Sequence, residues 1–239
     1  MVSVLIPAYN EADRIARTIE SVRQIDSGGD IEVIVVDDGS VDGTAEAAEH
    51  AGATRVLRQT NQGKGAALRA AAAVAAGEIL LLLDADLGET AGEAGKLLEP
   101  ITMGAADMAI ATFPVRPGRG GGAGLVVRLA RWGIHGLTGR VMLAPLSGQR
   151  AIRREVLEGS GAFADGWGVE IALTVRALWH GYRLQEVPTE MDHRVTGRDA
   201  ASILHRAAQF RAVLAVLIRL FLQQRREARV ALRTKTGDG

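Results

Sequence analysis

The sequence predicts an α/β fold, in which a mostly parallel sheet is flanked by helices. The first observation is the unbroken apolar run 79–83, which is typical of a strand buried on both faces. The second is the alternation of strand-like and helical segments along the first hundred residues, as in a doubly wound sheet. The third is that polar motifs directly follow three of these strands, where such sheets bind ligands.

Six strands are expected, each an apolar segment bounded by polar or turn-forming residues. They cover 2–6, 31–36, 55–57, 79–83, 106–113 and 182–187. Apolar residues at intervals of three and four, such as Ile15, Ile19 and Val22, predict helices between them. The helices are expected over 12–24, 44–51, 66–76, 125–137, 170–180 and 200–229. Asp42 or Ser40 is suited to cap the second helix.

Composition fits a globular protein with a normal core. The 239 residues suit one large α/β domain, or one domain with an appendage. The chain is 47% hydrophobic and 23% charged, and it has no cysteine, which excludes disulfides and thiolate chemistry. A strand is expected at the very start, so no signal peptide is expected. No apolar run reaches the roughly 18 residues of a membrane span.

Charge is balanced overall but unevenly distributed. Residues 1–100 carry 8 basic and 17 acidic side chains, a net charge of −9. Residues 101–190 carry a net charge of +3, and residues 191–239 carry +6. A basic C-terminal part is suited to phosphates, a membrane surface or nucleic acid.

Two carboxylates follow the central apolar strand. Asp84 and Asp86 are one residue apart, so in an extended segment their side chains point to the same side. Both can then face one hard cation, Mg²⁺ or Mn²⁺, that also bridges substrate phosphates. An acidic turn at the end of a strand is the alternative interpretation.

Two further motifs follow expected strands. Asp37 and Asp38 end the second strand, where a carboxylate is suited to accept hydrogen bonds from a base or a ribose, or to cap the next helix. The segment 63–65, Gly-Lys-Gly, opens an Ala-rich helix and places flexible backbone and one cation at its N-terminus, which suits an anion. A simple Gly-rich turn is the alternative there.

Together these motifs carry a resemblance to a known family. Pro-Ala-Tyr-Asn-Glu at 7–11, the Asp-Asp-Gly-Ser segment at 37–44, Asn-x-Gly-Lys-Gly at 61–65 and Asp-Ala-Asp at 84–86 stand in the order seen in GT-A glycosyltransferases. The chain resembles the large group that includes dolichyl-phosphate mannose synthase. The resemblance implies a GT-A (Rossmann-like) fold, a UDP- or GDP-sugar donor and a divalent cation, Mg²⁺ or Mn²⁺.

The resemblance also implies particular site residues. Asp86 would be the direct metal ligand and a catalytic residue, with Asp84 close by and His193 returning to the metal from a C-terminal loop. The donor would contact residues of the four motifs, namely Pro7, Ala8, Tyr9, Glu11, Asp38, Gly39, Ser40, Gly63, Lys64, Asp84 and Ala85.

The second half is expected to bind the acceptor. The Gly-rich loop 114–124 carries Arg116 and Arg119, which suit a phosphate or carboxylate, although a solvated loop is the alternative. Glu170 stands at the start of an expected helix, where the helix dipole favours a carboxylate, so a purely structural role is one interpretation. The other interpretation is a catalytic role, in which Glu170 forms a hydrogen bond to a sugar or acts as a base. The expected acceptor-binding residues are Arg116, Arg119, Ser147, Gly148, Gln149, Arg194 and Arg198. Arg150 is a further basic residue whose charge a phosphate-bearing acceptor would balance.

The second-half motifs also resemble the glucosyl-3-phosphoglycerate synthase family. They are Gly-Gly-Gly-Ala-Gly at 120–124, Pro-Leu-Ser-Gly at 145–148, Gly-Val-Glu-Ile at 168–171 and His193-Arg194. Gln149 and Arg150 depart from the Glu-Tyr pair of that family. The segment 193–198 also resembles bacterial envelope glycosyltransferases, so 3-phosphoglycerate and a polyprenyl phosphate both remain candidate acceptors.

The C-terminal part is expected to be a basic amphipathic helix. Residues 1–199 would form the catalytic domain, with a donor half over 1–113 and an acceptor half over 114–199; 200–233 would form the helix and 234–239 a disordered tail. An apolar stripe includes Phe210, Leu214, Leu217 and Phe221. A homodimer seam, a helix docked on its own domain and an interfacial membrane helix all fit this stripe, with the first two favoured.

The sequence therefore predicts a metal-dependent glycosyltransferase. It would move a hexose, with glucose favoured, from a UDP- or GDP-sugar to a phosphate-bearing acceptor. We expect a cytoplasmic homodimer, with peripheral contact to the inner face of the membrane as an alternative, and no nucleic-acid partner. A nucleotidyltransferase would need a Gly-rich phosphate loop directly after the first strand, which 7–11 does not supply. A non-catalytic sugar-nucleotide-binding module is the remaining alternative.

Overall fold

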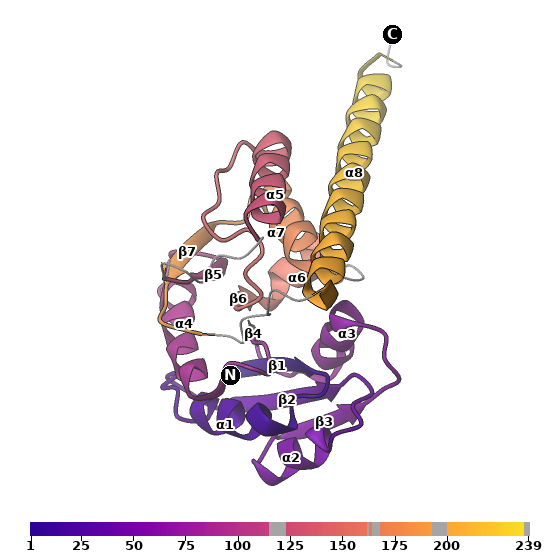
Figure 1. Ribbon diagram of the computed structural model, residues 1–239. Coiled ribbons are helices and arrows are strands. Elements are labelled where there is room, and N and C mark those ends of the chain that lie inside the picture. The colour runs from indigo at the N-terminus through magenta and orange to yellow at the C-terminus, as the bar shows by residue number, and fades with distance from the viewer. Residues whose placement is uncertain (115–122, 162, 164–167, 193–199, 237–239) are drawn as a thin grey trace.

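The computed structural model describes residues 1–114, 123–161, 163, 168–192 and 200–236. Within the last helix, side chains are described from residue 208 to residue 227. Figure 1 shows a central sheet between two layers of helices, with the C-terminal helix extending along the outside of the molecule.

The sheet has seven strands in the order β3-β2-β1-β4-β6-β5-β7. The strands are β1 (Val2–Ala8), β2 (Ile31–Asp37), β3 (Arg55–Arg58), β4 (Ile79–Leu82), β5 (Met108–Thr112), β6 (Arg150–Arg153) and β7 (Leu184–Pro188). All the neighbouring pairs that exclude β6 are parallel, whereas β6 is antiparallel to both β4 and β5. The predicted α/β fold with a mostly parallel sheet is therefore confirmed.

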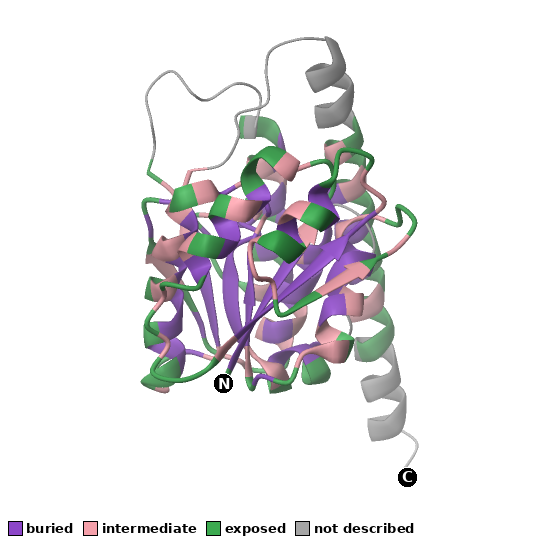
Figure 2. Ribbon diagram, turned by 90° about the horizontal axis from the view of Figure 1, so that it is seen from below, coloured by how far each residue is buried: buried purple, intermediate pink, exposed green. Residues whose placement is uncertain are grey.

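Helices cover both faces of the sheet. They are α1 (Ala12–Val22), α2 (Thr44–His50), α3 (Lys64–Val74), η1 (a 3₁₀ helix, Gly88–Ala94), α4 (Gly95–Thr102), α5 (Ala123–Thr138), α6 (Arg154–Ser160), α7 (Val169–Trp179) and α8 (Ala200–Thr236). Alternate strand residues enter two separate cores, because successive side chains point to opposite faces. The helices α1, α2, η1 and α4 close one core, and α3, α5, α6, α7 and α8 close the other. Figure 2 shows the strands buried between helices whose outer faces are exposed.

The expected strands are found within two residues of their predicted ends, but β6 was not expected. The segment 150–153 reads Arg-Ala-Ile-Arg, and only its two central residues are apolar. Two short helices, α4 and α6, and the 3₁₀ helix η1 were also not expected. The helix α8 continues to Thr236, so residues 234–236 are helical where a disordered tail was expected.

The helix α8 docks on the domain through a different stripe from the one expected. Val213, Val216, Leu217 and Leu220 are buried, and they recur at helical spacing. Leu217 packs against Gly133 of α5 so closely that a Cβ there would lie 2.4 Å from its Cδ2. Of the expected seam, Leu217 alone belongs to this buried face, because Phe210, Leu214 and Phe221 are exposed. In the described part of the chain, no helix is both long and apolar enough to cross a bilayer.

Candidate active site

Three of the predicted motif loops meet at the carboxyl edge of β1, β2 and β4. The strand β1 lies between the other two, and Ala8 pairs with Asp37 while Leu5 pairs with Leu82. Parallel strands end at the same edge of a sheet, so loops that are far apart in the sequence become neighbours. Because β6 runs in the opposite direction, its first residue, Arg150, pairs with Leu82 at this same edge. The loop before β6 therefore joins the loops after β1, β2 and β4.

The loops after β1 and β2 are connected by hydrogen bonds. The backbone N–H of Asn10 donates to Ser40 Oγ at 2.9 Å, and the amide of Ala12 donates to Asp42 Oδ2 at 3.1 Å. The N–H of Glu11 donates to Thr44 Oγ1 at 2.9 Å. A carboxylate at the N-terminus of α1 accepts an otherwise unpaired N–H and is favoured by the helix dipole. The hydrogen bond from Thr44 also holds the pKa of Asp42 below its ordinary value.

Asp38 is buried and holds the loop that precedes α3. Its Oδ1 accepts hydrogen bonds from Gln59 Nε2 at 2.7 Å and from the amide of Gln62 at 2.8 Å. Its Oδ2 accepts a hydrogen bond from the amide of Gly63 at 2.7 Å. The carboxylate thereby fixes Gly63 and the start of α3, while its predicted contact with a base or ribose stays a prediction. At Gly39, where φ is +84°, a Cβ would lie 3.0 Å from the nitrogen of Asn61, so this turn requires glycine.

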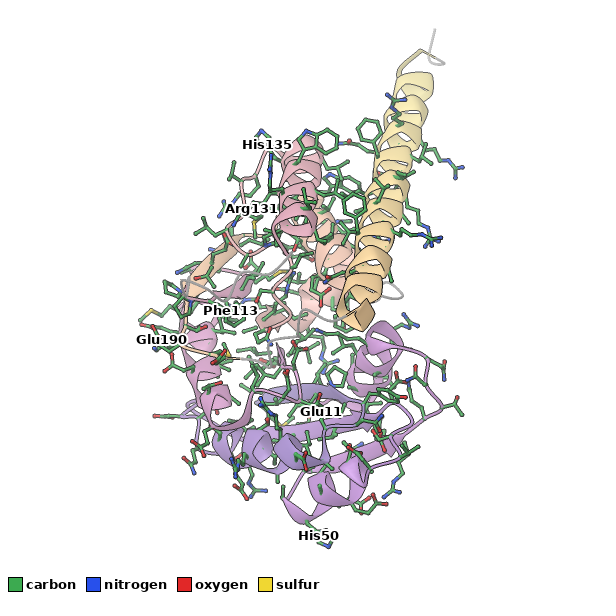
Figure 3. The ribbon with its side chains drawn as sticks, in the orientation of Figure 1. Glu11, His50, Phe113, Arg131, His135 and Glu190 are labelled. Carbon is green, nitrogen blue, oxygen red and sulfur yellow. The ribbon has the colours of Figure 1, made fainter. Side chains whose placement is uncertain are left out.

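The remaining predicted donor residues line this edge with mixed exposure. Ala8 is buried, Pro7 and Glu11 are half-buried, and Tyr9 is 51% exposed. An exposed aromatic ring beside a strand end is suited to stack on a nucleobase. Figure 3 labels Glu11, which lies directly before α1.

Asp84 is held on both carboxylate oxygens by residues from two other loops. Lys64 Nζ lies 2.7 Å from Asp84 Oδ1. Gln149 Nε2 donates to Asp84 Oδ2 at 2.8 Å. The lysine comes from the first residue of α3 and the glutamine from the loop before β6. Three separately predicted residues therefore converge at one point.

Lys64 also contacts Glu170, which links the site to α7. Its Nζ lies 3.0 Å from Glu170 Oε1, and the Glu170 side chain is 12% exposed. Burial opposes the charge of Lys64, but attraction to Asp84 and Glu170 outweighs it and raises the pKa of Lys64 above its ordinary value. Lys64 therefore stays protonated at neutral pH and bridges the two carboxylates.

Gly148 lets the backbone approach this ion pair. A Cβ at Gly148 would lie 2.5 Å from Lys64 Nζ and 3.1 Å from Asp84 Oδ2, whereas ordinary contacts begin at 3.4 Å. The neighbouring Ser147 hydroxyl is buried and has no hydrogen-bond partner among the described residues. The segment 147–149 thus packs directly on the charged cluster.

The turn that carries Asp86 is anchored on α1. Thr18, a fully buried residue of α1, donates through Oγ1 to the carbonyl of Ala85 at 2.8 Å and accepts the N–H of Gly88 at 2.8 Å. Arg14 donates to the carbonyl of Asp86 at 3.0 Å. These contacts fix the turn on both sides of the half-buried Asp86.

The donor set at this turn fits a hard cation. Asp84 and Asp86 supply carboxylate oxygens, the ligands that Mg²⁺ and Mn²⁺ prefer. Among the described residues there is no group of three or more His, Cys, Asp or Glu side chains placed to hold a metal ion. One or two carboxylates nevertheless suffice where a cation is also bound by substrate phosphates, which is a common arrangement for Mg²⁺.

The expectation that an acceptor phosphate balances the charge of Arg150 is wrong, because Arg150 lies in the interior. It is 1% exposed, and its guanidinium donates to the Ser147 carbonyl at 2.8 Å and to Thr174 Oγ1 at 2.8 Å. Burial lowers its pKa to about 10, against the opposing effect of Glu170 and Glu186. Arg150 therefore stays charged at neutral pH and ties the 144–150 loop to α7, and it is too deeply buried to contact an acceptor.

Five predicted residues lie outside the described part of the chain. They are Arg116, Arg119, His193, Arg194 and Arg198. Conversely, Arg14 and Thr18 were missed because they belong to a helix that the sequence assigned to the core. Thr18 did carry a signal, since it is a polar residue on the same helical face as Ile15, Ile19 and Val22.

The family model described as Glycosyl transferase family 2 matches residues 3–159, which include every motif loop described above up to the start of α6. The chain belongs to this family. Its predicted GT-A fold and its class, glycosyltransferase, agree with that membership.

Curated relatives include three kinds of glycosyltransferase. Glycosyltransferase AglJ of Haloferax volcanii is 36% identical over 210 residues, which cover 83% of this chain and 65% of that protein. Glucosyl-3-phosphoglycerate synthase of Mycolicibacterium paratuberculosis is 35% identical over 195 residues, covering 73% and 59%. Dolichol-phosphate mannosyltransferase of Pyrococcus furiosus is 29% identical over 207 residues, covering 82% and 58%. The chain thus spans about three fifths of the length of these relatives.

Solved structures of similar fold include glucosyl-3-phosphoglycerate synthase from Mycobacterium tuberculosis. Its complex with Mg²⁺ and uridine diphosphate has a TM-score of 0.77 at 28% identity, covering 92% of this chain and 79% of that one. Its complex with Mn²⁺, uridine diphosphate and phosphoglyceric acid has a TM-score of 0.77 at 30% identity, covering 92% and 78%.

Proposed function

We propose that this chain transfers a hexosyl group, with glucose favoured, from a UDP- or GDP-sugar to a phosphate-bearing acceptor. The observation that carries this proposal is the cluster at the carboxyl edge of β4, where Lys64 joins Asp84 to Glu170 beside the Asp86 turn. This cluster assembles predicted donor, metal and acceptor residues at one edge of the sheet. Family membership and the solved complexes with Mg²⁺ or Mn²⁺ and uridine diphosphate support the donor class.

The donor would lie across the loops after β1, β2 and β4. Tyr9 is exposed and would stack on the nucleobase, and the loop fixed by Asp38 would contact the ribose or diphosphate. Asp86 and Asp84 would hold Mg²⁺ or Mn²⁺, and when bound the cation would stabilise the charge of the departing nucleoside diphosphate. Lys64 and Gln149 keep the Asp84 carboxylate in place, so the chain's own contribution here is orientation.

The acceptor would approach from the side of Glu170 and Ser147. Glu170 is placed by the first turn of α7 and by Lys64, and it would orient or deprotonate the acceptor hydroxyl. The buried Ser147 hydroxyl lacks a hydrogen-bond partner among the described residues, so a sugar or acceptor hydroxyl would satisfy it. Arg116, Arg119, Arg194 and Arg198 stay proposed contacts for an acceptor phosphate.

Two acceptor classes follow from the relatives. Glucosyl-3-phosphoglycerate synthase favours a small phosphorylated acid, and a solved complex of that enzyme contains phosphoglyceric acid. Dolichol-phosphate mannosyltransferase instead favours a polyprenyl phosphate. Both acceptors present a phosphate monoester, so the proposed arginine contacts suit either one.

The test is a panel of UDP- and GDP-sugars with Mg²⁺ or Mn²⁺, in which release of the nucleoside diphosphate is measured with 3-phosphoglycerate, with a polyprenyl phosphate and with neither. We expect release to need the cation and to rise with one of the two acceptors. A folded protein that turns over no sugar nucleotide under any of these conditions would contradict the proposal.

Asp86→Ala tests the metal assignment. Since the lost carboxylate would help to hold the charge-stabilising cation, turnover should fall about a hundredfold or more. Binding of uridine diphosphate, measured by calorimetry, should lose its dependence on the cation. Asp30→Ala is the matched control, because Asp30 is exposed and directly precedes β2, at the opposite edge of the sheet. Near-normal turnover by Asp86→Ala would remove Asp86 from the metal site.

A further inference from the structure

The helix α8 carries a second apolar stripe that its docking leaves uncovered by the described residues. Phe210, Leu214, Ile218, Phe221 and Leu222 recur at helical spacing and are each between 37% and 51% exposed. Around the helix axis, these exposed residues form a continuous strip beside the buried docking stripe. The two stripes are therefore separate faces of one helix, and only one of them is explained by the fold.

The helix that packs beside α8, α5, also carries exposed apolar residues. Leu217 packs on Gly133, and Gln224 Nε2 donates to the carbonyl of Leu137 at 3.2 Å, so α5 and α8 lie side by side. Figure 1 shows the same arrangement, with the pair far from α2 and β3. Trp132, the neighbour of Gly133, is 74% exposed, and Leu125 is 69% exposed. We call the exposed apolar residues of α8 together with Trp132 and Leu125 the α5–α8 face.

The charges around this face are almost all positive. Among the described side chains of α8, the exposed arginines are Arg211, Arg219, Arg225 and Arg226, and helical spacing puts them within the stripe or beside it. The guanidinium of Arg225 lies over the ring of Phe221, 4.7 Å from its centroid. Residues 123–138 contain no Asp or Glu, and Glu227 is the one acidic residue between 208 and 227. Arg131 and His135 lie on the side of α5 that is turned away from α8 (Figure 3).

This combination distinguishes between two occupants. A second copy of the chain, related by a twofold axis, would bring this cationic face against itself, and the face has almost no carboxylates to pair with its arginines. An anionic lipid surface supplies both missing components, namely hydrocarbon for the apolar side chains and negative charge for the arginines. Tryptophan and arginine at the border of an apolar face are also typical of residues at a membrane interface.

We infer that the α5–α8 face binds the surface of an anionic membrane, with α8 lying along the interface. This inference is independent of the proposed function, because the face shares no residue with the candidate active site. It does not require a helix that crosses the bilayer, and it leaves the docking stripe of α8 in the core.

The test is co-sedimentation of the full chain with vesicles of phosphatidylcholine alone or of phosphatidylcholine mixed with phosphatidylglycerol, at low and high salt. We expect binding to the mixed vesicles that weakens as salt rises, and little binding to phosphatidylcholine alone. Binding that is equal for the two compositions, or absent from both, would overturn the inference.

Two variants assign the binding to this face. Leu214→Asp with Ile218→Asp should abolish sedimentation with the mixed vesicles. Arg219→Gln with Arg226→Gln should weaken it about 25-fold, since each basic residue near an anionic surface contributes about fivefold in affinity. All four side chains are exposed, so the thermal unfolding midpoint should stay close to that of the wild type.

Controls separate lipid binding from self-association. Met103→Asp places one new carboxylate at a residue that is 74% exposed at the end of α4, and it should bind vesicles like the wild type. Gel filtration with light scattering gives the oligomeric state in the absence of lipid. A wild-type dimer that becomes monomeric in the Leu214→Asp, Ile218→Asp variant, with no vesicle binding by either protein, would assign the face to a second copy and overturn the inference.

Discussion

Gly148→Ala is a sharp test of the charged cluster, because it adds one methyl group at a known distance from three atoms. The new Cβ would lie 2.5 Å from Lys64 Nζ and 3.1 and 3.3 Å from the two carboxylate oxygens of Asp84. Ordinary van der Waals contact begins at 3.4 Å, so the ammonium group would have to move by about 1 Å. Lys64 has a flexible stem and is able to make this movement, but its 2.7 Å contact with Asp84 would not survive unchanged.

The expected result is a loss of turnover with little loss of stability. A displacement of about 1 Å in a positioned group is able to cost about a hundredfold in rate, and we expect an effect of that order on kcat. The free energy of unfolding should fall by only about 1 kcal/mol, because the Lys64 side chain is 31% exposed and solvent screens its ion pairs. Release of nucleoside diphosphate gives kcat and KM, and urea unfolding gives the stability.

Gly136→Ala is the matched control. Gly136 lies within α5, and a Cβ there would have no neighbour within 4 Å. Alanine is favoured over glycine inside a helix by up to about 1 kcal/mol, so this variant should be at least as stable as the wild type and fully active. If Gly148→Ala kept wild-type kcat, the close approach of the backbone to Lys64 would have no catalytic role. A loss of kcat that arises only because Gly148→Ala unfolds would likewise contradict a role for the position of the Lys64 ammonium group.

Two further predictions concern charged side chains and their partners. A double-mutant cycle of Lys64→Met and Glu170→Gln, measured by urea unfolding, should give a coupling energy of about 1 kcal/mol, because solvent partly screens the contact between the two side chains. Purely additive effects of the two substitutions would show that the 3.0 Å ion pair does not stabilise the fold. The pKa of Glu32 is held below its ordinary 4.5, because hydrogen bonds from Ser3, Ala76 and Gly77 outweigh the effect of burial. Its stabilising contribution is therefore complete above about pH 4.5 and is lost as pH falls through the lowered pKa. Glu32→Gln should be less stable than the wild type at neutral pH, and urea unfolding at several pH values should show this difference in stability shrinking below pH 4.5. A difference that does not change with pH would show that the charge of Glu32 is not its cause.

The sequence predicted most of the strands of the sheet, but it did not predict the order in which the strands lie side by side. Apolar runs such as 79–83 predicted strands because strands covered on both faces need apolar residues on both sides. Nothing in Arg-Ala-Ile-Arg distinguishes β6 from a polar loop, since its two apolar residues are too few to show a period. Its antiparallel placement between β4 and β5 depends on contacts between residues that are distant in the sequence.

The site was predictable where it follows strand ends and unpredictable where side chains pair across the fold. Lys64, Asp84 and Glu170 were each named from local patterns, but their ion pairs join residues that are far apart in the chain. Arginine is rarely fully buried, so the interior position of Arg150 contradicted a reasonable expectation. Two adjacent apolar stripes on α8 both satisfy helical spacing, and the period alone could not select the one that docks.

The reversed direction of β6 has a consequence for the redesign of this site. The loops that follow β1, β2 and β4 and the segment 147–149 that precedes β6 reach the same edge of the sheet from two separate parts of the chain. Under the proposed function, changes within the second segment would alter the proposed acceptor contacts and leave the proposed donor loops unchanged. Grafting 139–149 from a relative with a different acceptor, with β6 kept as the anchor, is therefore a rational way to exchange acceptor preference in the laboratory.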